Sequence, residues 1–339
     1  MTIYPTTRSP RVTVFGGSGF VGRHVIAALA SRGFLIRNAV RRPDLAGHLQ
    51  PLGVLGQIQS VQANVRVPWS VENAVADADV VVNLVGILAE SGKQSFDAVQ
   101  GEGAATVARA AAARGAHMVH VSAIGADDRS PSAYARSKAY AEDAVLDAVP
   151  GAQIMRPSIV FGPEDDFFNR FAAMSRIAPA LPLIGGGTTR FQPVYVRDVG
   201  EAVACAVAGE ARPGTTYELG GPRVLTFREC LEEMLEATYR TKPFVTIPWG
   251  LASLMGSVME KLPGAPITSD QVALLRRDNV VSADAQREGR TLAGLGVAPT
   301  DLEAILPAYM VQYRREGQFA RAERKRAARL RDAEPAERA

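Results

Sequence analysis

Cysteine is scarce in this sequence: only two of its 339 residues are cysteines, and only four are histidines. Two cysteines are too few for a disulfide-stapled secreted domain or a cysteine-rich zinc site, and the histidines do not recur at the spacing of metal ligands. We therefore expect no metal site and a reducing compartment. Cys205 and Cys230 lie in apolar segments of helical periodicity, and we predict that both are buried packing residues.

Long apolar runs and a strong charge of one sign are also missing. No stretch reaches the ~20 apolar residues of a membrane-spanning helix, and residues 1–11 lack the apolar run that is typical of a secretory signal. The formal net charge is +3, but residues 314–331 contain eight basic and two acidic side chains, so the rest of the chain is slightly acidic. Local basicity with few interleaved aromatic residues does not favour nucleic-acid binding.

What the sequence does contain is a regular alternation of short apolar runs and helical patterns. Such alternation indicates right-handed βαβ crossovers and a parallel sheet. The predicted fold class is therefore α/β, a doubly wound parallel sheet of the Rossmann type with a smaller, interleaved C-terminal domain. The predicted strands are 12–15, 34–40, 58–63, 80–85, 117–121 and 153–156, and the predicted helices are 20–31, 70–77, 95–114 and 132–148.

The chain is long enough for two domains, and the alternating pattern loosens after Gly162. A strand, a helix and a second strand are then predicted to return to the first domain, at 193–196, 197–207 and 216–219. Thr226, followed three residues later by Glu229, is a capping box that predicts the start of a helix over 226–239. The predicted division is 11–162 plus 193–221 for a nucleotide-binding domain, 163–192 plus 222–313 for the smaller domain, and 314–339 for a basic tail, either helical or disordered.

A glycine-rich loop lies between the first predicted strand and the first predicted helix. Its glycines allow a sharp turn and a close approach to a pyrophosphate, and the last of them allows tight packing of helix on strand. The start of the helix then offers free N–H groups and the positive end of its dipole to the phosphates. The predicted cofactor-binding residues of this loop are Gly16, Ser18, Gly19, Phe20 and Gly22.

Two arginines, Arg41 and Arg42, follow the second predicted strand, where an NAD-specific protein usually has an acidic residue. Guanidinium groups pair with a 2′-phosphate, which a carboxylate would repel. One desolvated, charge-assisted contact of this kind contributes ~1.5–3 kcal/mol, enough for an at least tenfold preference. The sequence therefore favours NADP(H) as the cofactor. The alternative is a solvated surface pair with Asp44 close by.

Tyr134 and Lys138 are four residues apart, so they share one face of the predicted helix. An ammonium beside the phenol, together with the positive charge of a nicotinamide, is expected to lower the tyrosine pKa, so that Tyr134 can exchange a proton as hydride moves. Ser122, at the end of the preceding strand, can hold a substrate oxygen. These three are the candidate catalytic residues and are also predicted to contact the nucleotide; the alternative is a chance surface pair.

Together these motifs resemble an extended short-chain dehydrogenase/reductase, and the resemblance adds Asn83 and Pro157 to the cofactor-binding residues. Within this superfamily, a narrower family has sequence runs similar to three runs of this chain, at 83–87, 156–162 and 266–272. That family is the NADPH-binding accessory subunit of respiratory complex I, NADH dehydrogenase alpha subcomplex subunit nine, with its bacterial relatives. The resemblance covers about residues 11–315. It implies a tightly held NADP(H) that is structural rather than turned over, at the junction of the hydrophilic and membrane arms.

Two segments are candidates for contact with a membrane or a larger assembly. Residues 249–262 are suited to lie in an interface or groove, although most amphipathic helices pack on their own core. The basic segment 314–331 can hold a protein at anionic lipid, at ~1 kcal/mol per charge, or form a solvated helix. The apolar stripe of the first segment is formed by Leu251, Leu254, Met255, Val258, Met259 and Leu262.

Three functions follow as hypotheses. The first is an NADP(H)-binding accessory subunit of a respiratory NADH:quinone oxidoreductase, peripheral at the cytoplasmic face of a bacterial inner membrane, with the other subunits of that complex as partners. The second is an active, soluble, cytoplasmic NADP(H)-dependent reductase or epimerase that uses Tyr134 and Lys138. The third is an NADPH sensor of the isoflavone-reductase-like kind, which binds cofactor and partner without chemistry.

Overall fold

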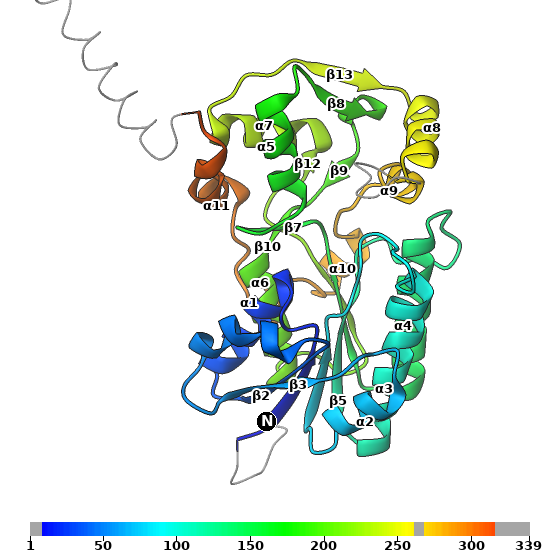
Figure 1. Cartoon of the computed structure of the whole chain (residues 1–339), viewed down its shortest axis with the longest axis vertical. Helices are drawn as coiled ribbons and strands as arrows, with labels where there is room; N and C mark the ends of the chain where they lie inside the picture. Colours follow the sequence, from blue (N-terminus) through cyan, green and yellow to red (C-terminus); the bar gives the residue numbers. More distant parts are fainter. Residues whose placement is uncertain (1–8, 261–267, 316–339) are drawn as a thin grey trace, which may run out of the picture.

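The computed structural model describes residues 9–260 and 268–315 (Figure 1). Its main feature is a seven-stranded sheet in the order β11-β6-β5-β4-β1-β2-β3, in which every neighbouring pair is parallel. This confirms the predicted doubly wound α/β fold. The strands are β1 (Arg11–Phe15), β2 (Leu35–Val40), β3 (Ile58–Gln62), β4 (Val80–Asn83), β5 (His117–Val121), β6 (Gln153–Pro157) and β11 (Thr216–Leu219).

Helices cover both faces of this sheet, because its valine-rich strands are buried on both sides. On one face, Val12 and Val14 of β1 join a core cluster with α1 (Phe20–Ser31) and α6 (Val196–Val207). On the other face, Phe15 and Val81 join a cluster with α2 (Pro68–Ala74), α3 (Glu102–Arg114) and α4 (Ala133–Ala148). Strand β11 joins the sheet and helix α6 packs on it from the later part of the chain, as predicted. The predicted strand 193–196 does not join this sheet, because β10 (Val194–Tyr195) pairs with β7 (Val160–Phe161) instead.

The predicted helix 95–114 is not uniform. A π-helix over Asp97–Gly101 precedes α3, and Phe96 at its start is buried. The close approach of Gly103 to Val65 accompanies this local widening, since a Cβ on Gly103 would lie 2.8 Å from the Val65 side chain. A π-helical turn inside a helix often marks a functional site, and this one lies beside the helix that carries Tyr134.

The smaller unit is built from short strand pairs and helices around an aromatic core (Figure 1). The pairs are β7 (Val160–Phe161) with β10 (Val194–Tyr195), β8 (Leu181–Ile184) with β13 (Phe244–Ile247), and β9 (Arg190–Phe191) with β12 (Leu225–Thr226). The helices are α5 (Phe167–Ile177), α7 (Phe227–Thr238), α8 (Trp249–Met259), α9 (Ser269–Leu274) and α11 (Leu302–Tyr309). Segments from before and after α6 therefore interleave in this unit.

Several local expectations can be compared with the structure directly. Thr226 and Glu229 form the predicted capping box at the start of α7. Cys205 and Cys230 are buried free thiols, which confirms their assignment as packing residues. The residue ranges of the two domains remain a prediction. Leu292 and Leu295 lie within the range given to the smaller domain but pack in the core of the sheet. They follow α10 (Ala283–Arg287) in the chain.

The sequence left open whether the apolar stripe of helix α8 packs on its own domain, and in the structure three of its side chains are exposed. Leu251, Leu254 and Val258 are 50%, 61% and 59% exposed. The buried face is formed by Ala252 and Gly256 instead, because small residues let α9 approach closely; a Cβ on Gly256 would lie 2.8 Å from the Ser269 nitrogen. The end of the predicted segment, 261–262, and the basic segment 314–331 beyond residue 315 lie outside the described residues.

Candidate functional site

The predicted site residues gather at one edge of the sheet. The carboxyl ends of parallel strands meet at this edge, which is where open α/β sheets bind ligands. Here the glycine loop follows β1, the two arginines follow β2, and Ser122 follows β5. Asn83 and Pro157 are the last residues of β4 and β6, and Tyr134 and Lys138 lie on α4, the next helix after β5.

The glycine loop leaves hydrogen-bond donors at the start of α1. Gly16 has a φ of +82°, a conformation that favours glycine, and its carbonyl oxygen accepts from the Gly19 nitrogen over 3.1 Å. Gly22 must lack a Cβ, since one would lie 2.3 Å from the Gly16 oxygen. Gly19, the N-cap of α1, provides no side-chain cap. The first turn of α1, which begins at Phe20 and is preceded by Ser18 and Gly19, could therefore hold an anion such as a pyrophosphate.

Arg41 and Arg42 are both exposed, but they point to different partners. Arg42 makes a bidentate contact with Asp44, with its terminal nitrogen 2.6 Å from the carboxylate. Arg41 donates to the neutral Gln94 side-chain oxygen over 2.6 Å. The charge of Arg41 is thus left uncompensated by this contact, whereas Arg42 is already paired. Nothing in the sequence distinguishes the two arginines, whereas in the structure they have different partners.

Ser122 and Lys138 lie deep in the site. Lys138 is 4% exposed, and its ammonium donates to the Val121 carbonyl oxygen over 3.3 Å, directly before Ser122 in the chain. Burial lowers the pKa of Lys138 to about 8. The Ser122 hydroxyl is buried and has no hydrogen-bond partner among the described residues. A buried hydroxyl without a partner costs free energy unless a ligand or water completes it, so Ser122 fits a ligand-binding role.

In the chain without a nucleotide the pKa of Tyr134 is not lowered, and the lower value expected beside a bound nicotinamide stays a prediction. Burial raises the pKa of Tyr134 to about 12, and the Asp270 carboxylate adds to the shift. The Lys138 ammonium lies 5.9 Å from the centre of the phenol ring. The reason is that desolvation of a phenolate outweighs the attraction of an ammonium that is itself partly neutral near pH 8.

Three neighbours of the site were not predicted. His120 is fully buried on β5, and the Asn83 amide donates to its Nδ1 over 3.2 Å. Gln100, from the π-helix, accepts from the Ile87 nitrogen and donates to Ser137, one residue before Lys138. Phe96 packs edge-on against Tyr134. His120 lies on β5 two residues before Ser122, which directly follows that strand, so period-two alternation was the available signal.

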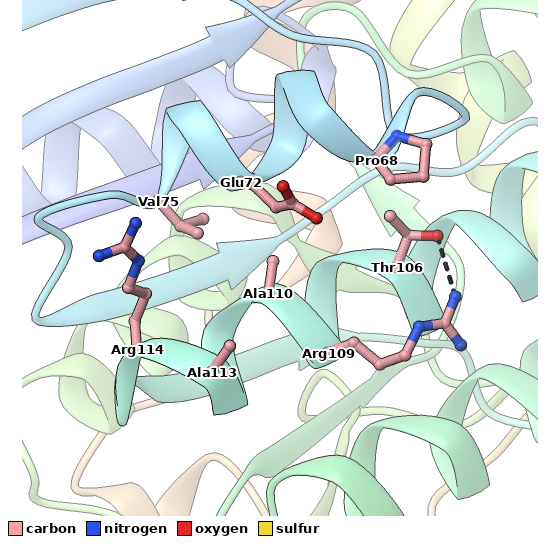
Figure 2. A pocket seen from close by; sticks show the side chains of 8 residues that line it. All are labelled: Pro68, Glu72, Val75, Thr106, Arg109, Ala110, Ala113 and Arg114. Atoms are coloured by element: carbon pink, nitrogen blue, oxygen red, sulfur yellow. Dashed lines mark hydrogen bonds between the residues drawn. The ribbon is translucent and has the colours of Figure 1, made fainter.

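Across the part of the chain that the structure describes, no group of three or more His, Cys, Asp or Glu side chains could hold a metal ion. Within 9–260 and 268–315 no helix has the length and apolarity that crossing a bilayer requires. A cavity of about 460 Å³ lies between α2 and α3 (Figure 2), and none of its lining residues is a predicted site residue. They are Pro68, Glu72, Val75, Thr106, Arg109, Ala110, Ala113 and Arg114.

Known proteins resemble this chain over most of its length. Residues 12–220 match the family described as "NAD dependent epimerase/dehydratase family". The chain is 36% identical to NADH dehydrogenase [ubiquinone] 1 alpha subcomplex subunit 9 of Arabidopsis thaliana, over 90% of this chain and 78% of the plant protein. It is 32% identical to a ceramide reductase of Caulobacter vibrioides, over 55% of this chain and 57% of that protein.

The fold also has close relatives among solved structures. The dTDP-glucose 4,6-dehydratase of Bacillus anthracis, solved in complex with NAD, superposes with a TM-score of 0.66 at 18% sequence identity. The superposition covers 90% of this chain and 96% of that one. At this level of identity the likeness concerns the fold, including the smaller unit that follows the sheet.

Proposed function

The chain belongs to the NAD dependent epimerase/dehydratase family and, within it, to the relatives of alpha subcomplex subunit 9, and from this we propose that it is an accessory subunit of a respiratory NADH:quinone oxidoreductase that holds NADP(H) as a structural cofactor. The observation that carries the proposal is the 36% identity over 90% of the chain, since it includes the smaller domain, which lies mostly beyond the family match at 12–220. Its partners are then the other subunits of that enzyme.

The residues at the carboxyl edge of the sheet fit a dinucleotide. The uncapped first turn of α1, with Gly16 and Gly19, would bind the pyrophosphate. Tyr134 and Lys138 would bind the nicotinamide ribose, and the unpartnered Ser122 hydroxyl would meet the nicotinamide end. When bound, a nicotinamide dinucleotide supplies hydride chemistry. The chain's own residues position it, and the high pKa of Tyr134 leaves the phenol as a hydrogen-bond donor rather than a base.

The preference for NADP(H) over NAD(H) rests on the end of β2. The chain has Arg41 and Arg42 at the place where a carboxylate would bind the ribose hydroxyls of NAD. Because Asp44 engages Arg42, we assign the 2′-phosphate mainly to Arg41. A guanidinium held only by a neutral amide can turn to a phosphate without breaking an ion pair.

The location we propose is peripheral, at the cytoplasmic face of a bacterial inner membrane. Helix α8 supports this, because three large apolar side chains, Leu251, Leu254 and Val258, are exposed along it. Exposed apolar groups that recur at helical spacing mark a surface that meets a partner or a membrane. Figure 1 places α8 at one edge of the smaller unit, beside α9, where it could dock while the sheet holds the nucleotide.

The experiment is native purification of the tagged chain from membranes in a mild detergent. The proposal expects subunits of NADH:quinone oxidoreductase in a particle far larger than 36.1 kDa, and NADP(H) released from it on denaturation. A free chain without other subunits, or a chain that carries no nucleotide, would contradict it.

A second candidate function is an active NADP(H)-dependent reductase. The observation that favours it is the Tyr134, Lys138 and Ser122 set, together with the similarity to a ceramide reductase over 55% of the chain. In that case Tyr134 would donate its proton to a substrate oxygen held by Ser122. Sustained NADPH oxidation with a panel of carbonyl compounds, abolished by Tyr134→Phe, would establish this function, and a lack of turnover under the same conditions would support the first.

A further inference from the structure

A segment of the smaller domain contacts the loop between β5 and α4, which begins with Ser122 of the candidate site. We call residues 268–282 the strap; it contains α9 and the chain that follows it. Three of its side chains contact the loop between β5 and α4. Asp270 contacts Ser132 and Ala133, Arg277 pairs with Asp127, and the Asn279 amide donates to the Ile124 carbonyl over 3.0 Å. The loop is therefore fastened at its beginning, middle and end by the other domain.

The Asp270 contact is the one at the start of α4, next to Tyr134. One carboxylate oxygen accepts from the Ser132 hydroxyl over 2.8 Å, and the other accepts from the Ala133 nitrogen over 2.6 Å. Ser132 is the N-cap of α4 and is fully buried. The start of α9 is capped separately by Thr268 and Gln271. The carboxylate of Asp270 therefore serves the helix of the other domain, not its own.

From this geometry we propose that Asp270 is a positioning residue for Tyr134, through which the smaller domain sets the nucleotide site. A negative charge at the N-terminus of a helix is favoured by the helix dipole and satisfies its free N–H groups. By fixing the first turn of α4, Asp270 fixes the backbone from which Tyr134 projects, and the Phe96 ring, 5.7 Å from the phenol ring between centroids, supports it from the π-helix. The nucleotide consequence rests on the proposed function.

The electrostatics point the same way. Among the described residues, the Lys138 ammonium lies near the phenol ring on its own helix, the Asp270 carboxylate acts on the phenol from α9, and the neutral Phe96 ring packs edge-on against it. Burial is the larger cause of the raised pKa of Tyr134, and the Asp270 charge adds to it. Asp270 therefore helps to keep the phenol protonated, which is the form that donates a hydrogen bond to a ribose or a substrate oxygen.

The first test measures NADPH affinity of the full-length chain by calorimetry in Asp270→Ala, with Asp278→Ala as the matched control. Asp278 lies on the same strap but pairs with Arg190 of its own domain. We expect about tenfold weaker binding in Asp270→Ala and less than twofold in the control. In a Tyr134→Phe background the effect of Asp270→Ala should shrink to about twofold, because the two residues act as one unit. Equal effects in both backgrounds, or none in either, would overturn the proposal.

The second test needs no nucleotide, so it separates this inference from the proposed function. Tyrosinate absorbance is titrated with and without Asp270→Asn, and Tyr134→Phe spectra are subtracted to isolate Tyr134. We expect Tyr134 to ionise at a lower pH in Asp270→Asn, because removal of a nearby negative charge stabilises a phenolate. An unchanged titration refutes the link between Asp270 and Tyr134. If Asp270→Ala folds poorly, Ser132→Ala replaces it in the NADPH-binding test. This variant keeps the Asp270 carboxylate and removes one of its hydrogen bonds, so it should give a smaller loss of NADPH affinity.

Discussion

The Lys138 ammonium on α4 donates a hydrogen bond to the Val121 carbonyl oxygen on β5, so the lysine is held between the helix and the end of the strand. Because burial lowers the pKa of Lys138 to about 8, this group changes charge in an accessible pH range. A ribose hydroxyl is bound by the ammonium and less well by the neutral amine. We therefore predict that NADPH affinity falls as the pH rises above about 8, by at most tenfold per unit.

The control for this pH dependence is Lys138→Met, which should bind NADPH more weakly at pH 7 and show no comparable decline between pH 7.5 and 9. Affinity is measured by the fluorescence of bound NADPH across that range. A wild-type affinity that stays constant to pH 9 would show that Lys138 does not contact the nucleotide in its charged form.

The two arginines after β2 give a prediction about selectivity. Because Arg42 is engaged by the Asp44 carboxylate while Arg41 donates to the neutral Gln94 side chain, Arg41→Ala should weaken NADPH binding about tenfold and leave NADH binding nearly unchanged. Arg42→Ala is the matched control and should change NADPH affinity much less. Affinities for both nucleotides are measured by calorimetry at fixed salt. Equal losses for NADH and NADPH in Arg41→Ala would contradict the assignment of the 2′-phosphate.

The sheet could be predicted, and a candidate site at its carboxyl edge could be proposed, because both depend on local patterns. Apolar runs such as Val80–Asn83 and the glycine loop between β1 and α1 each carry their signal within a few residues. The edge at which the site residues meet then follows, because the carboxyl ends of parallel strands lie at the same edge of a sheet.

Contacts between distant segments could not be predicted. Asp270 reaches Ser132 across 138 positions of sequence, and Asn279 reaches Ile124 across 155, so no local spacing indicates either contact. The face of α8 that is buried was also unpredictable, because Ala252 and Gly256 are selected by the approach of α9 rather than by their own hydrophobicity. For the same reason the raised pKa of Tyr134 in the chain without a nucleotide could not be predicted: the helical spacing to Lys138 was known, but the degree of burial was not.

The buried His120 gives a prediction about stability and pH. Burial lowers its pKa from 6.5 to about 3, with the Lys138 charge as the smaller cause. Between these two values the unfolded chain binds a proton that the folded chain does not, so stability is lost as the pH falls below 6.5. From pH 7 to pH 5 this one group should cost about 2 kcal/mol of unfolding free energy.

The measurement for His120 is urea unfolding at pH 7 and pH 5. In His120→Gln the loss between the two values should be smaller by about 2 kcal/mol than in the wild type. His48→Gln, at an exposed position, is the matched control and should leave the loss unchanged. An identical pH dependence in His120→Gln and the wild type would refute the assignment of this titration to His120.

The exposed side chains of α8 give a prediction about docking. Leu251, Leu254 and Val258 are each at least half exposed, so replacing all three with serine should change the stability of the isolated chain little. If they dock, the same change removes apolar burial of a few kcal/mol, and association should fall at least tenfold. The matched control changes an equal set in the sheet domain to serine: Leu45, Val54 and Leu55, which are 65%, 74% and 105% exposed. Both variants are compared by the fraction of chain recovered with membranes and by the amount of NADH:quinone oxidoreductase that co-purifies.

Because the two sets have the same composition, a loss confined to the α8 variant is explained by its position and not by a general increase in polarity. Equal recovery of both variants with the membrane would mean that α8 is not the docking surface.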